Sequence, residues 1–364
     1  MTKVNKENWE YKKLGDICEI LDSRRKPVTK EKREKGEYPY YGSTGIQDYV
    51  SSYLFDGRFL LLGEDGGKWG KYERSSFIAE GKIWVNNHTH ILKFSKDLLY
   101  KFVMYYLNYK DLSAYITGAV VPKLTQANMR SIMLPIPSLK EQDYITNLFD
   151  RVTNLITLKQ KQLKEFDSLE QSVFYKMFGD LYSEMKWKTS LLKDVITLRN
   201  GRAYKQEELL PSGKYKVLRV GNFFSNNKFY YSDLELEDNK YCNPGDLLYT
   251  WSASFGARIW SGERCIYHYH IWRVDFDENI FNKIFLLYML NNLTDLFKER
   301  LHGVGMMHLT KQMMEEKIIP LPPLSLQQSF AQKIEVIEKQ KEVVKNEIAQ
   351  LQALLDSEMD KYFG

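Results

Sequence analysis

The 364-residue sequence contains only three cysteines, Cys18, Cys242 and Cys265, and none of them forms a CxxC pair. Three scattered cysteines are too few for a disulfide framework, so the sequence predicts a protein of a reducing compartment, namely the cytoplasm. No apolar run reaches the roughly 18 residues that a membrane-spanning helix needs. The opening "MTKVNKENWEYKK" also lacks the apolar core of a secretory signal peptide.

Catalytic motifs are missing as well. The sequence has no GxxxxGK[ST] phosphate-binding loop, no GxGxxG after a strand and no GxSxG nucleophile turn. "NPGD" at Asn243 differs from the Asn-Pro-Pro-aromatic loop with which amino-methylating enzymes hold a target adenine. These absences favour recognition or scaffolding over chemistry.

Two histidine pairs, His88 with His90 and His268 with His270, have a spacing that would place both side chains on one face of a strand. No third or fourth ligand follows at a spacing typical of a metal site. We therefore expect hydrogen-bonded strand histidines and no metal.

The charge is unevenly distributed. Residues 1–140 carry 23 Lys and Arg against 16 Asp and Glu, and residues 181–324 carry 19 against 17. Residues 141–180 and 325–364 are mildly acidic, each with 5 against 7. A basic excess on compact domains fits a polyanionic partner, although ordinary surface solubility explains it equally well.

The sequence contains a long internal repeat. Residues 118–179 match residues 303–364 without a gap, from Gly118 on Gly303 to the closing "FG" of each copy. The segments "LPIPSLKEQ" and "LPPLSLQQ" are part of this match. The earlier part of each half matches more loosely, with "HTHILKF" resembling "HYHIWRV". A repeat of this length predicts a duplicated unit. Each copy has a globular part that differs between the copies, followed by a tail that is similar in both.

Each tail is predicted to be a long helix. Ser138 and Ser325 are candidate N-caps, and Glu141 stands three residues after Ser138, as in a capping box. About 37 residues at 1.5 Å each give a helix of about 55 Å. Apolar residues recur at heptad spacing, interrupted in one helix by Lys159 and Glu170 and in the other by Lys341 and Glu358. Such a seam needs a partner helix.

We expect the two helices to pack on each other as an antiparallel coiled coil with pseudo-two-fold symmetry. In the alternative, each helix packs on its own globular part. The predicted interface consists of Ile145, Phe149, Val152, Ile156, Leu163, Phe166, Val173, Phe330, Ile334, Ile337, Val344, Ile348, Leu351 and Leu355.

Both globular parts are predicted to be mixed α/β. Strand candidates are "RFLLLG", "HTHILKF", "KVLRVGNF", "DLLYTW" and "HYHIWRV", and helix candidates are residues 97–108 and 280–301. The intervening loops, such as "YYGSTGIQDY" and "TWSASFGAR", combine glycines, aromatic rings and polar groups. This mixture suits contacts with phosphates and base edges. A basic run, "SRRKPVTKEKREK", adds a possible phosphate clamp or a plain solvated loop.

These features together resemble the specificity (S) subunit of type I restriction-modification enzymes. The resemblance is based on "YYGSTGIQDYV", "GDLLYTWSASFG", the run "LTQANMRSIMLPIPSLKEQ" and its copy, and it covers nearly the whole chain. It implies an α+β protein with target-recognition domains at 1–140 and 181–324 and spacer helices at 141–180 and 325–364. In the first half only "FDGRFLL" stands where the second half has the family's "KYCNPGDLL".

The resemblance further implies a non-catalytic subunit that reads a bipartite asymmetric site in double-stranded DNA. It implies docking of two methyltransferase (modification) subunits and of restriction subunits with ATPase and nuclease activity. S-adenosylmethionine, ATP and Mg²⁺ would then belong to those partner subunits, and this chain would need no cofactor.

Candidate DNA contacts follow from the loops. We expect phosphate contacts from Arg24, Arg25, Lys26, Lys68, Lys71, Arg202, Lys205 and Arg258. We expect base-edge contacts from Ser43, Thr44, Gln47, Trp69, Tyr204, Asn222, Ser252 and Ser254. Two alternatives remain: a stand-alone methyltransferase or nuclease with cryptic motifs, and a helical scaffold whose globular parts bind protein.

Overall fold

The computed structural model describes residues 4, 6–95, 100–183, 186–224, 228–252, 254–301 and 309–364. The chain divides into two compact units, which we call the first unit (residues 1–162 with 344–364) and the second unit (residues 163–343). Residues 97–99 of the first predicted helix and Gly303 of the repeat lie outside the described residues. Within the described ranges, no helix combines the length and apolar character needed to span a bilayer.

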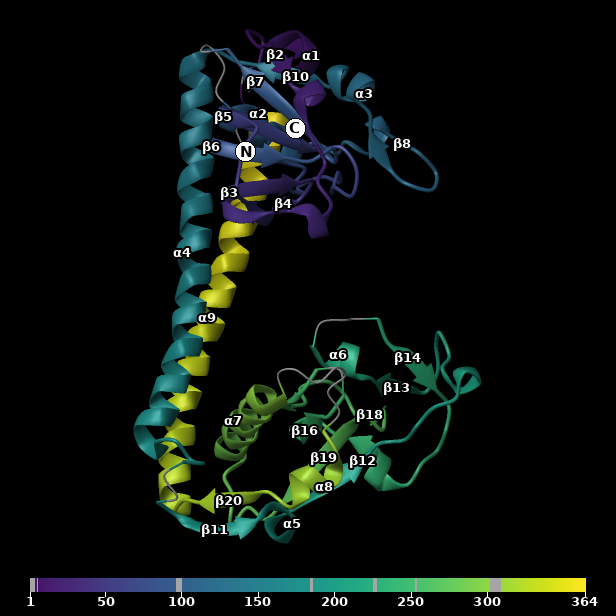
Figure 1. Ribbon diagram of the computed structural model, residues 1–364, viewed down its shortest axis with the longest axis vertical. Helices are drawn as coiled ribbons and strands as arrows, with labels where there is room; N and C mark the ends of the chain where they lie inside the picture. Colours follow the sequence, from purple (N-terminus) through teal and green to yellow (C-terminus); the bar gives the residue numbers. More distant parts are fainter. Residues whose placement is uncertain are drawn as a thin grey trace. The chain divides into compact units, whose positions relative to one another are not determined.

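The first unit is built on a six-stranded mixed sheet (Figure 1). Its strands, in spatial order, are β2 (Cys18–Ile20), β7 (Thr89–Phe94), β5 (Phe55–Gly63), β6 (Ser76–Val85), β3 (Lys35–Gly42) and β4 (Gly45–Val50). β3 runs parallel to β6 and the other neighbours are antiparallel. The unit's other elements are β1 (Glu10–Lys13), α1 (Leu14–Ile17), α2 (Tyr100–Tyr109), β8 (Ile116–Thr117), β9 (Lys123–Leu124), α3 (Gln126–Arg130) and β10 (Met133–Ile136).

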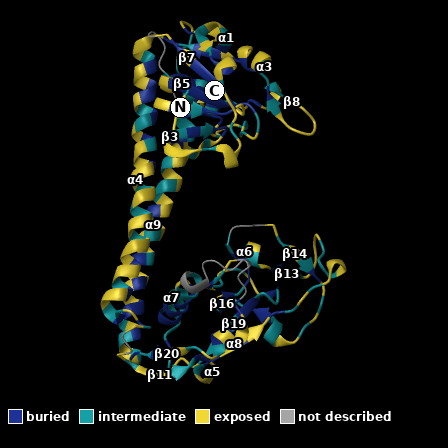
Figure 2. Cartoon of the chain, in the orientation of Figure 1, coloured by how far each residue is buried: buried dark blue, intermediate teal, exposed yellow. Residues whose placement is uncertain are grey.

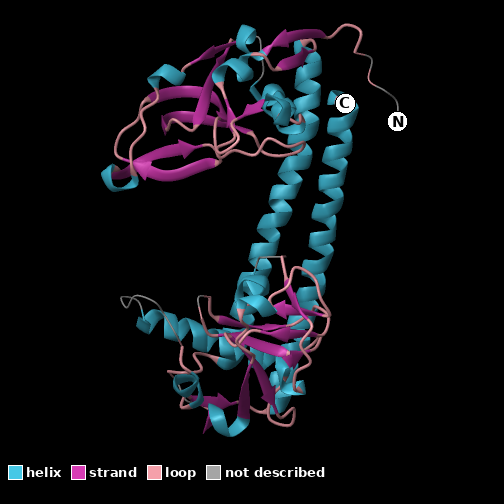
Figure 3. Ribbon diagram, turned by 90° about the vertical axis from the view of Figure 1, so that its right-hand side faces the viewer, coloured by secondary structure: helices cyan, strands magenta, loops and turns pink. Residues whose placement is uncertain are grey.

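Helix α2 connects the first sheet to the long helices. Val103 and Leu107 are fully buried in a cluster with the sheet residues Leu60 and Leu92. The opposite side of α2 carries Phe102, Tyr105 and Tyr109, which belong to a second buried cluster with residues of both long helices. Figure 3 shows the two long helices side by side. Burial on two sides explains why the short apolar run at 100–109 is a helix in the core.

The second unit has two four-stranded sheets in place of one. The first has the order β12 (Ile196–Asn200), β19 (Ile271–Phe276), β16 (Leu247–Thr250) and β17 (Gly256–Ile259). The second has the order β14 (Tyr230–Ser232), β13 (Tyr215–Leu218), β18 (Cys265–Tyr267) and β15 (Tyr241–Cys242). Also present are β11 (Lys188–Leu191), α5 (Leu192–Val195), α6 (Val220–Phe224), α7 (Lys283–Leu301), α8 (Lys311–Glu315) and β20 (Ile318–Leu321). Short 3₁₀ turns occupy Asp22–Arg24, Lys30–Lys32, Ser113–Tyr115, Gln206–Glu208 and Asp238–Lys240.

The two units share one strand framework. β2-β7-β5-β6 corresponds to β12-β19-β16-β17, and the parallel pair β3 and β6 corresponds to β13 and β18. In the first unit the ten-residue β6 serves both positions, whereas the second unit divides them between β17 and β18. Cys242 and Cys265, distant in sequence, face each other on β15 and β18 as free thiols with sulfurs 3.3 Å apart.

Some predicted strands are shorter than expected. "KVLRVGNF" forms β13 only as far as Leu218 and continues as α6. "HYHIWRV" becomes a strand only from Ile271, and β7 begins at Thr89. Of the four histidines, His90 alone therefore lies in a strand, which corrects the prediction of strand pairs on one face.

The repeat tails are helices of equal length, α4 (Leu139–Phe178) and α9 (Leu324–Phe363). The predicted capping box at α4 is present, because Glu141 N donates to Ser138 Oγ at 3.3 Å and Ser138 N donates to Glu141 Oε2 at 3.1 Å. Ser325 is not an N-cap. α9 already begins at Leu324, and the Pro323 carbonyl accepts from Leu326 N at 2.9 Å.

The two helices pair in antiparallel orientation. In the first unit Phe149, near the start of α4, packs on Tyr362 and Phe363 at the end of α9, with ring centroids 6.1 and 5.6 Å apart. In the second unit Phe174, near the end of α4, packs on Phe330 near the start of α9 at 5.4 Å. The α+β fold with an antiparallel coiled coil is thereby confirmed. The helices also pack on the globular parts, through Tyr105 and Phe285.

Buried and half-buried residues follow the predicted seam (Figure 2). Nine of the fourteen predicted interface residues are buried, namely Ile145, Phe149, Val152, Ile156, Phe330, Ile334, Ile337, Val344 and Leu355. Leu163, Phe166, Val173, Ile348 and Leu351 are half-buried. The charged interruptions form ion pairs. Lys159 meets Glu347 at 2.7 Å, and Lys341 meets Glu170 at 3.1 Å.

Candidate nucleic-acid interface

Corresponding loops meet in both units at the carboxyl ends of the two parallel strands. In the first unit they are residues 42–45 and 86–88, and in the second unit residues 219–222 and 268–270. We call them the first and the second loop pair. Asn86 N donates to Tyr41 O at 3.0 Å, and His268 N donates to Leu218 O at 2.9 Å in the same way. Ligands of open α/β sheets bind at the carboxyl ends of strands, so these loop pairs are candidate recognition surfaces.

The first loop pair presents neutral polar groups. Thr44 and Gln47 are exposed, whereas Ser43 is buried. Gln47 Oε1 accepts from Asn86 Nδ2 at 3.3 Å, which joins the two loops. The Gln47 side chain lies directly over Gly42, where a Cβ would come within 2.1 Å of Nε2. Glycine at position 42 is therefore needed for this arrangement.

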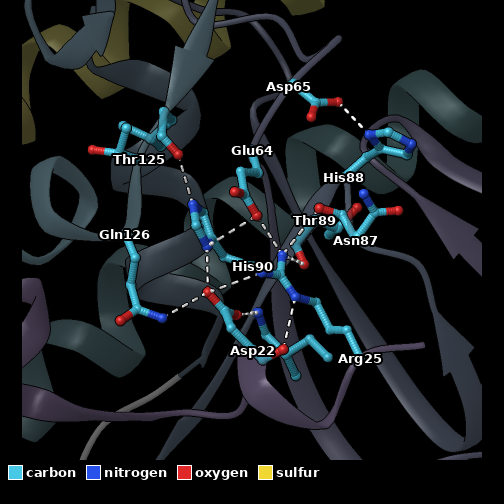
Figure 4. A network of polar contacts seen from close by, with 12 residues as sticks. Asp22, Arg25, Glu64, Asp65, Asn87, His88, Thr89, His90, Thr125 and Gln126 are labelled. Atoms are coloured by element: carbon cyan, nitrogen blue, oxygen red, sulfur yellow. Dashed lines mark hydrogen bonds and ion pairs between the residues drawn. The ribbon is translucent and has the colours of Figure 1, made fainter. Parts of the chain in front are cut away.

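A buried polar network supports the first loop pair (Figure 4). His90 Nδ1 lies 2.6 Å from Asp22 Oδ2, and His90 Nε2 lies 2.8 Å from the Leu124 carbonyl oxygen. Gln126 Nε2 also donates to Asp22 at 3.0 Å. Burial raises the pKa of the Asp22 carboxyl, but the hydrogen bonds from His90, Gln126 and the Ile91 N–H lower it more, so that the pKa is below its ordinary value. Asp22 is thus held as a carboxylate.

Arg25 belongs to this network. Its guanidinium donates to the carbonyl oxygens of Asp22 and Thr89 at 2.9 Å each and forms an ion pair with Glu64. Of the expected phosphate contacts in this segment, Arg24 and Lys26 are exposed, whereas Arg25 is committed to holding the loop that precedes β7. In that loop, His88 Nδ1 lies 2.5 Å from Asp65 Oδ1 (Figure 4).

Asp22, Glu64 and His90 offer ligand atoms within 4.8 Å of one another, the geometry of a possible metal site. Both His90 ring nitrogens are engaged, however, and Glu64 is also paired with Lys123 at 2.9 Å. A cation would have to displace Arg25 and Lys123. The residues therefore fit a charge-compensated network better than a metal centre.

Three further candidates of the first unit lie close together in sequence and differ in placement. Lys68 is exposed. Trp69 packs against the core and donates from Nε1 to Gly63 O at 3.1 Å. Lys71 forms an ion pair with Asp360 of α9 at 2.8 Å, so the structure gives Trp69 and Lys71 roles within the unit.

The second loop pair encloses a cavity of about 510 Å³. It is lined by Arg219, Val220, Gly221, Asn222, Lys228, Tyr230, His268, Tyr269 and His270, with no carboxylate among them. Of these, only Asn222 was a predicted site residue. It accepts from Arg219 N at 3.2 Å and donates to Lys228 O at 2.7 Å, which shapes the loop. From the sequence, His268 and His270 were expected to be hydrogen-bonded strand histidines and no metal ligands, and a place in the lining of a cavity was not predicted for them.

The other candidates of the second unit are not among the residues that line this cavity. Arg202 makes two hydrogen bonds to Glu208, at 2.7 and 2.6 Å, which lower the pKa of Glu208 to about 2. Tyr204 is half-buried, Ser252 is buried, and Lys205 and Ser254 are exposed. Arg258 donates to Phe223 O at 3.2 Å and lies over the Phe224 ring. The structure thus brings Arg202 and Tyr204 near His268 but holds Arg202 in an ion pair.

The layer below the loops differs in chemistry between the units. In the strand register, Trp272 occupies the position that is equivalent to His90 of the first unit. Trp272 pairs with Tyr249 on β16, just as His90 pairs with Leu62 on β5. Trp272 stacks on Tyr249 and on Trp251, with centroids 5.7 and 5.8 Å apart. The first unit thus supports its loops with buried charges and the second with stacked rings.

Burial, with His270 and Arg219 nearby, lowers the pKa of His268 to about 4, so this ring is neutral at pH 7.

The chain matches the model of a family described as the type I restriction modification DNA specificity domain, over residues 6–167 and again over 184–353. The two matches correspond to the two halves of the repeat.

Individual relatives agree with this match. A putative type I restriction enzyme specificity subunit of Haemophilus influenzae is 29% identical over 74% of this chain and 73% of its own length. The MjaVIII specificity subunit of Methanocaldococcus jannaschii is 23% identical over 95% of this chain and 90% of its own. A crystal structure of a type I S subunit from M. genitalium has a TM-score of 0.56 at 16% identity, covering 100% of this chain and 98% of that one. That likeness concerns the fold.

Proposed function

Because the chain belongs to the type I restriction modification DNA specificity family, we propose that it is the specificity subunit of a type I restriction-modification complex. Each unit reads one half of a bipartite, asymmetric site in double-stranded DNA. The observation that supports this best is the pair of matching strand frameworks with different residues at the same loops. Two related reading surfaces of different chemistry are what an asymmetric site requires.

The long helices supply the spacing. Forty residues at 1.5 Å each give about 60 Å of helix. Half-sites read from one face of DNA are separated by about one helical turn, roughly 34 Å. A coiled coil of this length is sufficient to fix that separation.

The same helices offer docking surfaces for two methyltransferase subunits. With Phe149, Ile156 and Leu163 as heptad position a, the exposed Leu155 and Leu169 occupy position g. The exposed Leu158 occupies position c, which adjoins g on the helix circumference. In α9 the exposed Val336 and Val343 also occupy c, and Leu354 occupies g. Leu158 corresponds to Val343 in the repeat, and Leu169 to Leu354, so these two exposed apolar positions occur in both helices.

In this proposal the chain carries out no chemistry itself. Restriction subunits would join the same complex, and S-adenosylmethionine, ATP and Mg²⁺ would be used by the partner subunits in the cytoplasm.

The test uses the chain assembled with its modification subunits. The complex is incubated with genomic DNA and S-adenosylmethionine, and the methylated adenines are mapped. We expect one bipartite motif with a fixed gap. Methylation without this chain, or scattered methylation with it, would contradict the proposal.

Two controls separate the alternative functions. Modification or cleavage of DNA by the purified chain alone, with Mg²⁺ and S-adenosylmethionine, would support a cryptic enzyme. A scaffold that binds only protein would show no DNA affinity that declines with salt, whereas a DNA-reading complex shows a steep decline.

A further inference from the structure

The cavity of the second loop pair has a composition that the rest of the second unit does not share. Apart from Val220 and Gly221, its lining residues are basic, aromatic or amide, and both Arg219 and Lys228 come from the connection between β13 and β14. No Asp or Glu is among its lining residues, a composition that favours an anionic ligand. Resting on the proposed function, this cavity is the natural place for the second unit to meet the polyanion.

Arg219 is exposed, and no carboxylate among the described residues pairs with it. The contrast within the unit is clear, since Arg199 and Arg273 pair with Asp275 and Arg264 pairs with Asp238 at 3.1 Å. Those guanidiniums are already paired with carboxylates of the protein. Arg219 is the arginine among the residues that line the cavity, and its guanidinium donors are available to a ligand.

The orientation of Arg219 is also constrained. Its guanidinium carbon lies 5.2 Å from the centroid of the Tyr230 ring, a cation–π contact. Its backbone N–H donates to Asn222 Oδ1 at 3.2 Å, which fixes the loop that carries it. A guanidinium stacked on an aromatic face presents its edge donors in a defined plane, the geometry that bidentate recognition needs.

We propose that Arg219 is a specificity-determining residue of the second unit that reads a guanine of the second half-site through its O6 and N7 atoms in the major groove. Bidentate contact with those two acceptors is the commonest specific use of arginine on DNA. Lys228, on the same connection between β13 and β14, contacts the phosphate backbone beside it. The first loop pair, with Thr44 and Gln47 exposed, has no arginine at the corresponding position, because Gly42 stands there. Guanine reading by this mode therefore belongs to the second unit.

The experiment compares the wild-type complex with an Arg219→Gln complex, each containing the modification subunits. Both are presented with a DNA duplex library that is randomised at every position of the mapped site. We expect Arg219→Gln to relax one G·C pair of one half-site by on the order of 10- to 100-fold, with the other half-site read as before. Unchanged reading of that other half-site also shows that the variant is folded and assembled.

Arg264→Gln is the matched control, because this arginine is paired with Asp238 and lies outside the cavity. It should leave every position unchanged. Uniform loss of affinity with Arg219→Gln, accompanied by a salt slope lower by about one, would identify a phosphate contact and overturn the proposal. Relaxation at an A·T pair, or no relaxation, would overturn it too. If the wild-type complex selects no site from the library, the proposed function itself fails.

Discussion

Lys341 of α9 donates from Nζ to both carboxylate oxygens of Glu170 on α4, at 3.1 and 3.2 Å, within the seam between the helices. The Tyr288 hydroxyl donates to the same carboxylate at 2.8 Å. Burial raises the pKa of the Glu170 carboxyl even with these donors, so its charge depends on the lysine. Two of the four residues that interrupt the predicted heptads, one in each helix, are thus partners.

We expect Lys341→Met to destabilise the second unit by about 3 kcal/mol, because it leaves a buried carboxylate without its cation. Adding Glu170→Leu should recover most of this loss, although Tyr288 then lacks its acceptor. Urea unfolding followed by hydrogen exchange of the second unit measures the effect. Lys339→Met, at an exposed position of the same helix, is the control. Equal losses in the single and double variants would contradict a coupled pair.

Acid should weaken the first unit through Asp22. Its pKa in the folded protein is below the ordinary value of 3.8, so its contribution is present above that pH and is lost as the pH falls through the lowered pKa. Asp22→Asn should therefore cost about 2 kcal/mol at pH 6 and progressively less below pH 4. The comparison is made by unfolding both proteins across this range, with Asp56→Asn at an exposed position as the control. A deficit that does not change with pH would rule out this role.

The closing phenylalanines of the repeat give a matched pair of variants. Phe363 packs on Phe102, Tyr106 and Phe149 in the first unit, with centroids 5.3 to 5.6 Å apart. Phe178, its counterpart in the repeat, packs on Phe285 at 4.7 Å in the second unit. Each change to alanine should cost about 3 kcal/mol in its own unit alone. Limited proteolysis with fragment identification reports which unit opens, and each variant serves as the control for the other. Opening of the same unit in both variants would contradict the assignment.

The exposed c positions should govern partner stoichiometry. We expect Leu158→Glu or Val343→Glu to remove one of two modification subunits, and the double variant to remove both, because a carboxylate cannot be buried in an apolar contact. Mass measurement of the reconstituted complexes gives the stoichiometry. Gln160→Glu, exposed on the other flank of α4, should keep both subunits. Full stoichiometry in the double variant would place docking elsewhere.

Lengthening both helices should lengthen the DNA spacer. Inserting one heptad after Gln162 and one after Val343 keeps the seam in register and adds about 10.5 Å, equivalent to about three base pairs. Mapping the methylated sites of this variant gives the new gap. A heptad exchanged for a different heptad of equal length should leave the gap unchanged. An unaltered gap after insertion would show that the helices do not set it.

The duplication, the long helices and the family were predictable because each depends on a pattern that recurs in the sequence: the repeat itself, the heptad spacing and the proline segment before each helix. The capping box at Ser138 was predictable for the same reason. Ser325 failed as a cap, because it aligns with Lys140 inside the helix, whereas Pro323 occupies the position of Ser138. Both helices begin at equivalent leucines, Leu139 and Leu324, so proline in place of serine removes the side-chain cap without moving the start of the helix.

The site was less predictable because long-range partners decide what each side chain does. Arg25 and Lys71 belong to loops that suit phosphate contacts, but Glu64 and Asp360, distant in sequence, pair with them. The match between "HTHILKF" and "HYHIWRV" aligns His90 with His270. The strand register instead makes Trp272 the residue of the second unit that is equivalent to His90. A shift of two residues preserves the alternation of a strand, so the hydrophobic pattern could not detect it.

The first unit is assembled from both ends of the polypeptide, since residues 344–364 belong to it. During synthesis the second unit has all its parts as soon as Val343 has left the ribosome. The first unit, although translated earlier, waits for the last twenty-one residues to cover Phe102 and Phe149. A chain that stops before residue 344 would therefore contain every residue of the second unit but lack part of the first, although the first unit begins earlier in the sequence.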